Sequence, residues 1–333
     1  MANGATTPSR LGQENGTGDV NKLFLKVFSG EILTTFDETT VMKELHTIRT
    51  IKNGKSAQFP VAGTATASYH TPGENIADAG AGYLSTIKHG EKVITIDDML
   101  IASSFISNID ELKNHYDLRS VYAKELGKAL AYRFDEATIK TLIAASYATS
   151  EIGGQDGEQV TGLDTADVTS IIAKIFEAAQ KLDEHDVPSD SRYAIITPAL
   201  YYKLLTADNV AINKDTTNAG NADVGKGTLM EIAGISLKVS NRLAGLQGNT
   251  GNAGDNGQSN DIFGDDGTGY TPTANIDAPI VVAHPSAIGT VKLLDLATES
   301  EYQIERQGTL FVAKYLMGHG ILRPEASVVI TDA

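Results

Sequence analysis

The C-terminal segment, Ile280–Ala333, constrains the fold more than any other part of the chain. It is written as long apolar and β-branched runs, a composition typical of β-strands. We therefore predict two or three long strands, at Val291–Leu294, Gln303–Leu316 and Ser327–Ile330, whose register the pattern does not fix. No catalytic motif interrupts these runs, which favours a structural role for the segment.

The strongest helix pattern covers residues 108–148, where no proline occurs. Asp117 can cap the main segment, and Tyr116 and Val121 are placed for a hydrophobic staple. About 30 residues at a rise of 1.5 Å predict a rod of roughly 45 Å, which suits a structural spine. Apolar residues recur at spacings of three and four: Leu118, Val121, Tyr122, Leu126, Ala129, Leu130, Phe134 and Ala137.

Residues 51–97 carry the pattern of a long β-hairpin. Alternating polarity at Ser56–Val61 and at Lys92–Ile96 predicts two strands, and Pro72-Gly73 is a turn dipeptide. The intervening stretch Ala77–Gly82 consists of small residues and Asp, which predicts a weakly ordered tip. Because the two strands hold too few apolar residues for a core of their own, the hairpin must lie on its own domain or on a neighbouring molecule.

The N-terminal region divides into two parts. Residues 1–21 are rich in Gly, Asn, Thr and Ser and contain no apolar core of a secretory signal, so we expect them to be disordered in the isolated protein. Leu23–Met42 is apolar but short. It is either an arm that pairs with another subunit or a strand and helix of the core.

Residues 151–284 have the pattern of an α/β unit, entered through the acidic, glycine-rich linker Glu151–Asp164. A helix is predicted to start at Asp164 or Thr165, with Ile171, Ile172, Ile175, Phe176, Ala179 and Leu182 on its apolar face. Further elements are predicted as strands at Tyr193–Thr197, Ile235–Ser240 and Ile280–Ala283, a helix at Pro198–Leu205, and an exposed low-complexity loop at Gly245–Asn275.

Composition excludes several classes of function. The chain has no cysteine, which rules out disulfides and thiolate metal sites. Its net charge of −15 argues against a dedicated nucleic-acid binder and against docking on an anionic membrane. No apolar run approaches the roughly 20 residues that a membrane-spanning helix needs.

Two stretches resemble a nucleotide-binding or a metal-binding motif, but neither matches the motif in full. The stretch from Gly220 to Thr228 lacks the hydroxyl residue that a phosphate-binding loop places directly after its lysine, because Gly227 stands there. Four aspartates of the glycine-rich loop do not have the spacing of a calcium-binding loop: Asp255, Asp261, Asp265 and Asp266. We expect at most an adventitious cation there.

The histidines offer no metal or catalytic pattern either. None of the seven has the spacing of a helical metal site, and no serine–histidine–carboxylate set can be assembled. His185 lies among acidic residues, but its place before Val187-Pro188 predicts a solvated helix end. We therefore predict no catalytic, cofactor-binding or metal-binding residue, no cofactor, and no Lys–Asn cross-link between subunits. The seven are His46, His70, His89, His115, His185, His284 and His319.

Several segments, in one order along nearly the whole chain, resemble a known family, the major capsid proteins of T7-like short-tailed phages. Residues 150–275 resemble it least. The matching segments are Leu23–Leu33, Gly54–Val61, Pro72–Asn75, Glu91–Asp97, Asn114–Tyr122, Ala287–Leu296 and Ala313–Ala326.

This resemblance implies the Hong Kong 97-type capsid fold, an α+β architecture with an N-terminal arm, a projecting hairpin called the E-loop, a peripheral domain with a spine helix, and an axial domain. The implied boundaries are 1–50 for the arm, 51–97 for the E-loop, 98–150 with 285–333 for the peripheral domain, and 151–284 for the axial domain.

The same resemblance implies a non-enzymatic head protein of the virion. It would assemble in the host cytoplasm, as pentamers and hexamers, into an icosahedral shell around double-stranded DNA. The implied partners are other copies of the chain, a scaffolding protein, a portal protein at one vertex, and DNA bound without sequence specificity; no membrane is implied. Two alternatives stay open: an encapsulin-like compartment of the same fold, and an α/β enzyme built on residues 151–284.

Overall fold

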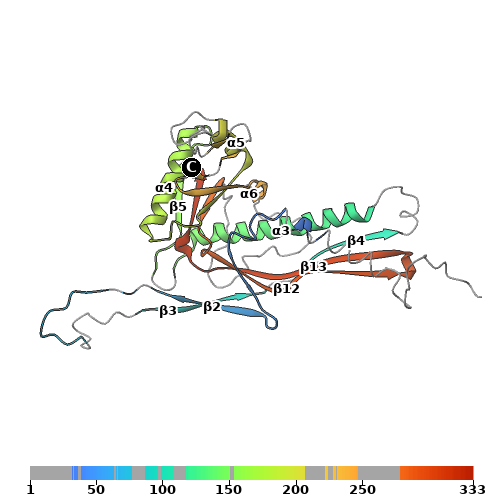
Figure 1. The fold of residues 1–333 in the computed structure, drawn as a ribbon, viewed down its shortest axis with the longest axis horizontal. Coiled ribbons are helices and arrows are strands. Elements are labelled where there is room, and N and C mark those ends of the chain that lie inside the picture. The colour runs from blue at the N-terminus through green and yellow to red at the C-terminus, as the bar shows by residue number, and fades with distance from the viewer. Residues whose placement is uncertain are drawn as a thin grey trace, which may run out of the picture. The chain divides into compact units, whose positions relative to one another are not determined.

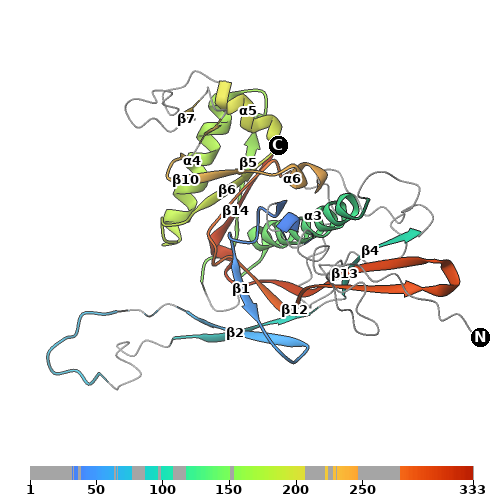
Figure 2. The same cartoon turned by 45° about the vertical axis from the view of Figure 1, so that its right-hand side comes forward.

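The chain folds into two compact units that each draw on several parts of the sequence (Figures 1 and 2). Unit 1 comprises Met1–Thr39, Ile101–Leu130 and Leu296–Lys314, and unit 2 comprises Thr40–Leu100, Ala131–Asp295 and Tyr315–Ala333. The computed structural model describes residues 32, 34–36, 39–63, 65, 67–76, 87–96, 99–107, 118–150, 154–206, 222–223, 228–229, 231–246 and 278–332.

A six-stranded mixed sheet in unit 2 carries much of the core. Its order is β5-β14-β11-β6-β10-β9, and β6 and β11 at its centre are fully buried runs of apolar residues, which predicts their place inside a covered sheet. Helices α4 and α5 lie beside the sheet in both views. The strands are β5 Glu158–Leu163, β6 Tyr193–Ile196, β9 Glu231–Ile232, β10 Ile235–Val239, β11 Ile280–Ala283 and β14 Ser327–Asp332.

Strand β14 differs from its prediction. We assigned Ser327–Ile330 to the peripheral domain together with the other long C-terminal strands, but β14 pairs antiparallel with β11 and parallel with β5 in the six-stranded sheet. A four-residue apolar run is equally suited to either sheet, so its pattern does not select a partner. The Ser327 hydroxyl donates to the Leu142 carbonyl at 3.0 Å, so this end of the chain is tied to helix α3.

Helix α4, Val168–Glu184, begins later than predicted. Its N-cap is Asp167, whose side chain accepts from the Thr169 N–H, whereas Asp164 accepts from Ala166 in the turn before the helix. The predicted apolar face is buried except for Phe176, which is 48% exposed. The other short elements of unit 2 are α5 Pro198–Thr206, α6 Asn241–Leu246, β7 Ala222–Asp223, β8 Thr228–Leu229 and the turn η2 Pro324–Ala326.

A second sheet has the order β1-β12-β13-β4 and contains the two longest strands. We predicted a strand over Gln303–Leu316, but Gln303 ends β12, and a 3₁₀ turn, η1, precedes β13. Gln307 makes this reversal in the left-handed conformation, with φ 48°, which glycine or asparagine more often adopts. The strands are β1 Thr47–Thr50, β4 Leu100–Ser107, β12 Ile288–Gln303 and β13 Gly308–Ile321, and η1 covers Ile304–Arg306.

From Leu310 to Met317, the side chains of β13 alternate between two environments. The odd-numbered set is buried: Phe311, Ala313, Tyr315 and Met317. The even-numbered set is half-buried: Leu310, Val312, Lys314 and Leu316. The second set defines what we call the outer face of β13.

Helix α3, Leu118–Tyr147, confirms the predicted long helix, while Tyr116, Asp117 and the rest of 108–117 lie outside the described residues. Its second half, in unit 2, is buried at most positions. In unit 1 a Cβ at Gly127 would lie 2.9 Å from the Ile32 carbonyl oxygen, so glycine permits the N-terminal segment to approach the helix backbone. No helix in the described ranges has the length and apolar content needed to cross a membrane.

The predicted hairpin is present. Strand β2, Ser56–Ala62, pairs antiparallel with β3, His89–Thr95, and the register runs from Ser56↔Thr95 to Ala62↔His89. Ala57, Val61 and Ile94 are buried, while Val93 is exposed, so one face of the hairpin is covered by its own chain. The predicted tip, Ala77–Gly82, lies outside the described residues, as does most of the predicted loop Gly245–Asn275, whose first two residues instead end helix α6.

Candidate assembly surfaces

The base of the hairpin packs directly on three glycines, Gly289, Gly318 and Gly320, which we call the glycine seat. A Cβ at Gly318 would lie 2.0 Å from the Thr95 carbonyl oxygen, and one at Gly320 would lie 2.6 Å from the Ile94 side chain. A Cβ at Gly289, on the neighbouring strand β12, would likewise press against the side chains of Leu322 and Ile94. Strand β3 therefore lies directly on the backbone of β12 and β13, at a distance that any larger residue would prevent.

Apolar packing fixes the hairpin base on this seat. Ala57, Ile94 and Ile96 form one buried cluster with Val291 and Leu322. Four half-buried side chains extend the cluster: Ile51, Phe59, Leu293 and Leu316. The backbone N–H of Ile96 also donates to the Lys55 carbonyl at 2.8 Å, closing the base of the hairpin. The hairpin is thus anchored at one end by its own chain.

Beyond this base the hairpin exposes large apolar side chains. Tyr69 is fully exposed, Ile76 is 58% exposed, and Ile87 is also exposed. Leaving several such residues in water on one projecting segment is unfavourable for a monomer, and clustered exposed apolar residues mark interaction sites. The hairpin is therefore a candidate surface for contact with another molecule.

A buried carboxylate holds the segment that precedes β1. The backbone N–H groups of Val41 and Met42 donate to the two carboxylate oxygens of Asp135, at 2.9 and 3.1 Å. Asp135 projects from helix α3, so this pair of bonds joins the N-terminal segment to the helix within unit 2. Both bonds go to a charged acceptor, the stronger class of hydrogen bond.

Two histidines and a threonine continue this connection across the sheet. His46 Nδ1 lies 2.6 Å from the Met42 carbonyl oxygen, so Nδ1 carries the proton and donates. Nε2 of His46 then accepts from the Thr290 hydroxyl at 2.7 Å, and the same oxygen accepts from His319 Nδ1 at 2.8 Å. The Phe134 ring packs against both imidazoles, at centroid distances of 5.8 and 5.6 Å.

Burial sets the charge state of this network. Burial lowers the pKa of His46 to about 4, with a further contribution from the charge of Lys292. Burial likewise lowers the pKa of His319 to about 3, so both rings are neutral at pH 7. Burial raises the pKa of Asp135 to about 6, even though two backbone donors favour its charged form. Nε2 of His319 is buried and has no hydrogen-bond partner within the described part of the chain.

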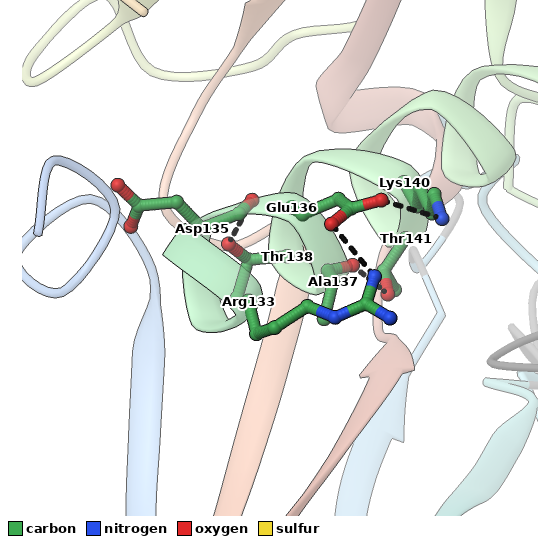
Figure 3. Close-up of polar contacts among 7 residues, drawn as sticks. All are labelled: Arg133, Asp135, Glu136, Ala137, Thr138, Lys140 and Thr141. Carbon is green, nitrogen blue, oxygen red and sulfur yellow. Dashed lines mark hydrogen bonds and ion pairs between the residues drawn. The ribbon is translucent and has the colours of Figure 1, made fainter. Parts of the chain in front are cut away.

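The opposite side of the same helical turn carries an ion-pair cluster (Figure 3). Glu136 bonds to Arg133 at 2.9 Å and to Lys140 at 3.0 Å, while the Asp135 carboxylate points away from them. Burial opposes ionisation of Glu136, but its bonds to Lys140 and Arg133 prevail and lower its pKa. The Thr138 hydroxyl donates to the Phe134 and Asp135 carbonyls inside the helix. Ion pairs of Glu136 therefore stabilise the more exposed side of this turn, and the hydrogen bonds to the Asp135 carboxylate stabilise its buried side.

The histidine predicted at a solvated helix end is in fact buried. His185 does end α4, as predicted, but its side chain is only 7% exposed. Its Nδ1 lies 3.2 Å from the Glu325 carbonyl oxygen, and its Nε2 lies 3.7 Å from Glu158. The segment before β14 covers the ring, and this contact lies 140 residues away along the chain, beyond the reach of a local pattern.

The other candidate residues fall into two groups. Gly227, His115 and the four aspartates of the glycine-rich loop lie outside the described residues. Of the remaining histidines, His46 and His319 share the network above, His70 contacts the Glu74 carbonyl, His284 contacts Ser286, and His89 is exposed at the start of β3. Among the described residues, no three His, Cys, Asp or Glu side chains gather closely enough to hold a metal ion.

The Gp10A-like family model, described as a major capsid protein, matches residues 58–331. The chain belongs to this family of major capsid proteins. It is 36% identical to the major capsid protein of Escherichia phage T7 over 343 residues, covering 95% of this chain and 96% of that protein. It is 35% identical to the major capsid protein of Enterobacteria phage T3, covering 99% and 98% of the two chains.

The structure agrees with this assignment. It superimposes on the capsid structure of the cyanophage P-SCSP1u with a TM-score of 0.71 and 35% identity, covering 99% of both chains. The predicted α+β capsid fold is thereby confirmed, as is the prediction of a structural virion component that is not an enzyme. The encapsulin-like and enzymatic alternatives are not favoured, because these relatives are phage capsid proteins.

The sequence did not indicate the glycine seat or the Asp135–His46–Thr290–His319 network. Gly318-His319-Gly320 has the appearance of a turn, and only the alternation along β13 reveals two glycines on its outer face with a histidine behind them. A period-two pattern continued through 310–321 was the one local signal that could have found them.

Proposed function

We propose that copies of this major capsid protein assemble as pentamers and hexamers into an icosahedral shell around double-stranded DNA. The observation that carries the proposal is the hairpin, which is anchored on Gly318 and Gly320 but exposes Tyr69, Ile76 and Ile87. An element fixed at its base and apolar beyond it is suited to cover a neighbouring copy. The ring contacts of such a shell are heterologous, so the angle between identical patches sets its curvature.

The proposed domains assign these features to parts of the chain. Residues 1–50 form the arm, 51–97 the E-loop, 98–150 with 285–333 the peripheral domain, and 151–284 the axial domain. The position of β14 in the six-stranded sheet adds one feature, because the last strand of the peripheral segment then crosses into the axial sheet.

Partners other than the chain itself follow from the same proposal. A scaffolding protein directs assembly in the host cytoplasm, and a portal protein occupies one vertex. The packaged DNA is held without sequence-specific contacts. The net charge of −15 supports this last point, because an acidic wall repels phosphate rather than binding it.

A single variant with three substitutions tests the proposal. Tyr69→Ser, Ile76→Ser and Ile87→Ser, combined in one variant, remove apolar groups that are exposed in the single chain. The thermal midpoint should stay within about 2 °C, since exposed positions contribute little to stability. The yield of shells, counted by electron microscopy after co-expression with the scaffold, should fall at least tenfold.

Tyr202→Ser is the matched control, because Tyr202 is 61% exposed on α5 and far along the chain from the hairpin. Full shell yield from the triple variant would contradict the role given to the hairpin. Small discrete oligomers of the wild-type protein at every concentration would contradict the shell itself.

A further inference from the structure

The turn between strands β1 and β2 contains the dipeptide Asn53-Gly54, the only asparagine–glycine pair in the described part of the chain (Figure 2). Both residues are exposed, as are Lys52 and Lys55 on either side. Gly54 has φ 118°, a backbone conformation that residues with a side chain rarely adopt. The turn therefore requires a glycine at the position that directly follows an asparagine.

Neither residue of this pair is held by a neighbour. Within the described ranges, the Asn53 side chain and the Gly54 N–H have no hydrogen-bond partner. A Cβ at Gly54 would meet a single atom within 4 Å, the Ser56 carbonyl oxygen at 3.7 Å, so the space around the glycine is open. The backbone nitrogen of Gly54 can thus approach the side-chain amide of Asn53.

The chain is anchored on both sides of the pair. On the β1 side, the Ile51 N–H donates to the Lys292 carbonyl at 2.8 Å. On the β2 side, the Lys55 carbonyl accepts from the Ile96 N–H at 2.8 Å. The segment 52–54 therefore joins two fixed points, one on strand β12 and one at the base of the hairpin.

We propose that Asn53 is a site of spontaneous modification, where asparagine converts to aspartate and isoaspartate through a cyclic imide. The deprotonated Gly54 nitrogen attacks Asn53 Cγ. The N–Cγ bond forms, the Cγ–Nδ2 bond breaks, and the side-chain nitrogen takes a proton from water and leaves as ammonia. Water then opens the imide at Cγ, which gives aspartate, or at the backbone carbonyl, which gives isoaspartate. Solvent water is the only co-reactant, and the inference is independent of the proposed shell.

The other two asparagines in the described ranges lack these conditions. Asn241 begins helix α6, and the nitrogen that would have to attack its side chain, that of Arg242, donates to the Ser240 hydroxyl at 3.2 Å. Asn75 is followed by Ile76, whose branched side chain hinders the approach. Asn53 is therefore the described asparagine that has both a glycine after it and an unbound attacking nitrogen.

The products change the turn in charge and in length. Each product places one negative charge between Lys52 and Lys55. Isoaspartate also routes the backbone through the former side chain, which lengthens the chain by one atom. Because Ile51 and Lys55 are held on either side, the added length strains the bond between Lys55 and Ile96. A copy that carries isoaspartate is thus expected to hold the base of its hairpin less firmly.

Peptide mass spectrometry of protein aged at physiological temperature and mildly alkaline pH tests the modification. Cleavage after glutamate releases residues 45–74, whose only asparagine is Asn53. We expect the mass increase of an amide-to-acid change in this peptide, in two chromatographic forms, one of which an isoaspartyl methyltransferase labels. The rate in the folded chain should lie within about threefold of the rate in urea, because an unbonded turn needs no opening. Asn241 should be slower in the folded chain than in urea by about fivefold or more, because the Arg242 N–H must first leave its cap.

Asn53→Gln is the matched variant, because its side chain is one carbon longer and would have to close a larger ring. Its peptide 45–74 should stay unmodified, with an unchanged circular dichroism spectrum. Protection of Asn53 by more than about tenfold in the folded chain would overturn the inference, since the turn would then need to open before reacting. Equal modification in Asn53→Gln would assign the change to the other amide of the peptide, Gln58, and would also overturn it.

Hydrogen exchange measures the consequence for the hairpin. The Ile96 amide should exchange about fivefold faster in aged wild-type protein than in equally aged Asn53→Gln, because its bond to the Lys55 carbonyl is weakened. The amides of β6, which lie in the buried sheet, should exchange equally in both samples. Equal exchange at Ile96, in protein shown to carry isoaspartate, would overturn the predicted loosening of the hairpin base.

Discussion

Thr290 joins two buried histidines, so its hydroxyl is the most informative single group to remove. It donates to His46 Nε2 and accepts from His319 Nδ1, at 2.7 and 2.8 Å, and it is fully buried. Thr290→Val keeps the volume and the β-branched shape of the side chain. Two buried ring nitrogens then lose their partner, at about 1–3 kcal/mol each. We expect the free energy of unfolding to fall by about 2–5 kcal/mol.

Thr141→Val is the matched control. Thr141 is also buried, but its hydroxyl donates only to the Ala137 carbonyl of its own helix, at 2.9 Å. That carbonyl belongs to the helix ladder, so the same substitution should cost less than about 1 kcal/mol there. The two substitutions thus differ in the network that they break and not in their chemistry.

Urea unfolding of the unassembled protein at pH 7.5 measures the difference. Far-UV circular dichroism is the suitable probe, because the chain has no tryptophan. A loss in Thr290→Val within about 0.5 kcal/mol of the loss in Thr141→Val would refute the reasoning, since it would show that neither histidine depends on the hydroxyl.

Three further predictions follow. Because burial lowers the pKa values of His46 and His319 from 6.5 to about 4 and 3 and raises that of Asp135 from 3.8 to about 6, the folded state binds fewer protons than the unfolded chain between pH 6 and 4. The stabilisation that the two histidines provide is complete above pH 6.5 and is lost on acidification, whereas Asp135 opposes this loss. Between pH 6 and 4 the three groups together should lower the free energy of unfolding by about 1.4 kcal/mol for each pH unit of acidification. Urea unfolding curves that do not change over this pH range would contradict the prediction. Gly318→Ala places a methyl group against the Thr95 carbonyl and should accelerate proteolysis between residues 51 and 97 about tenfold, with unchanged secondary structure; an unaltered digestion rate would show that the seat tolerates a side chain. Asp167→Ala removes the N-cap of α4 and should cost about 1 kcal/mol in a urea titration, whereas no change would mean that the Thr169 N–H finds another acceptor.

Features encoded by local pattern were predictable from the sequence. The long helix, the hairpin strands and the buried run Tyr193–Ile196 each depend on a period that neighbouring residues reveal. The start of α4 was misplaced by three residues from Asp164, because Asp164 and Asp167 both have capping side chains and only the backbone geometry selects Asp167. Phe176 was misassigned because it lies at the border of the apolar stripe, one position from the buried Ile175.

Features that depend on distant partners were not predictable in this way. The pairing of β14 with β5 joins residues more than 150 positions apart, such as Ile330 and Val160. The burial of His185 likewise depends on the segment around Glu325. The hairpin left two possibilities open, its own domain or a neighbour, and the structure shows that its base takes the first.

The link between His46 and Thr290 also has a consequence for the time at which the protein becomes complete. The two residues are 244 positions apart, and His319 follows later still. At about 5–20 residues per second, a ribosome needs roughly 12–50 s to travel from one to the other. Asp135 follows Val41 by only 94 positions, but the Thr290 hydroxyl is absent throughout that interval, so the docking of the segment before β1 stays incomplete. The nascent chain therefore cannot present a finished subunit to its neighbours before synthesis is nearly over, which delays association until each copy is whole.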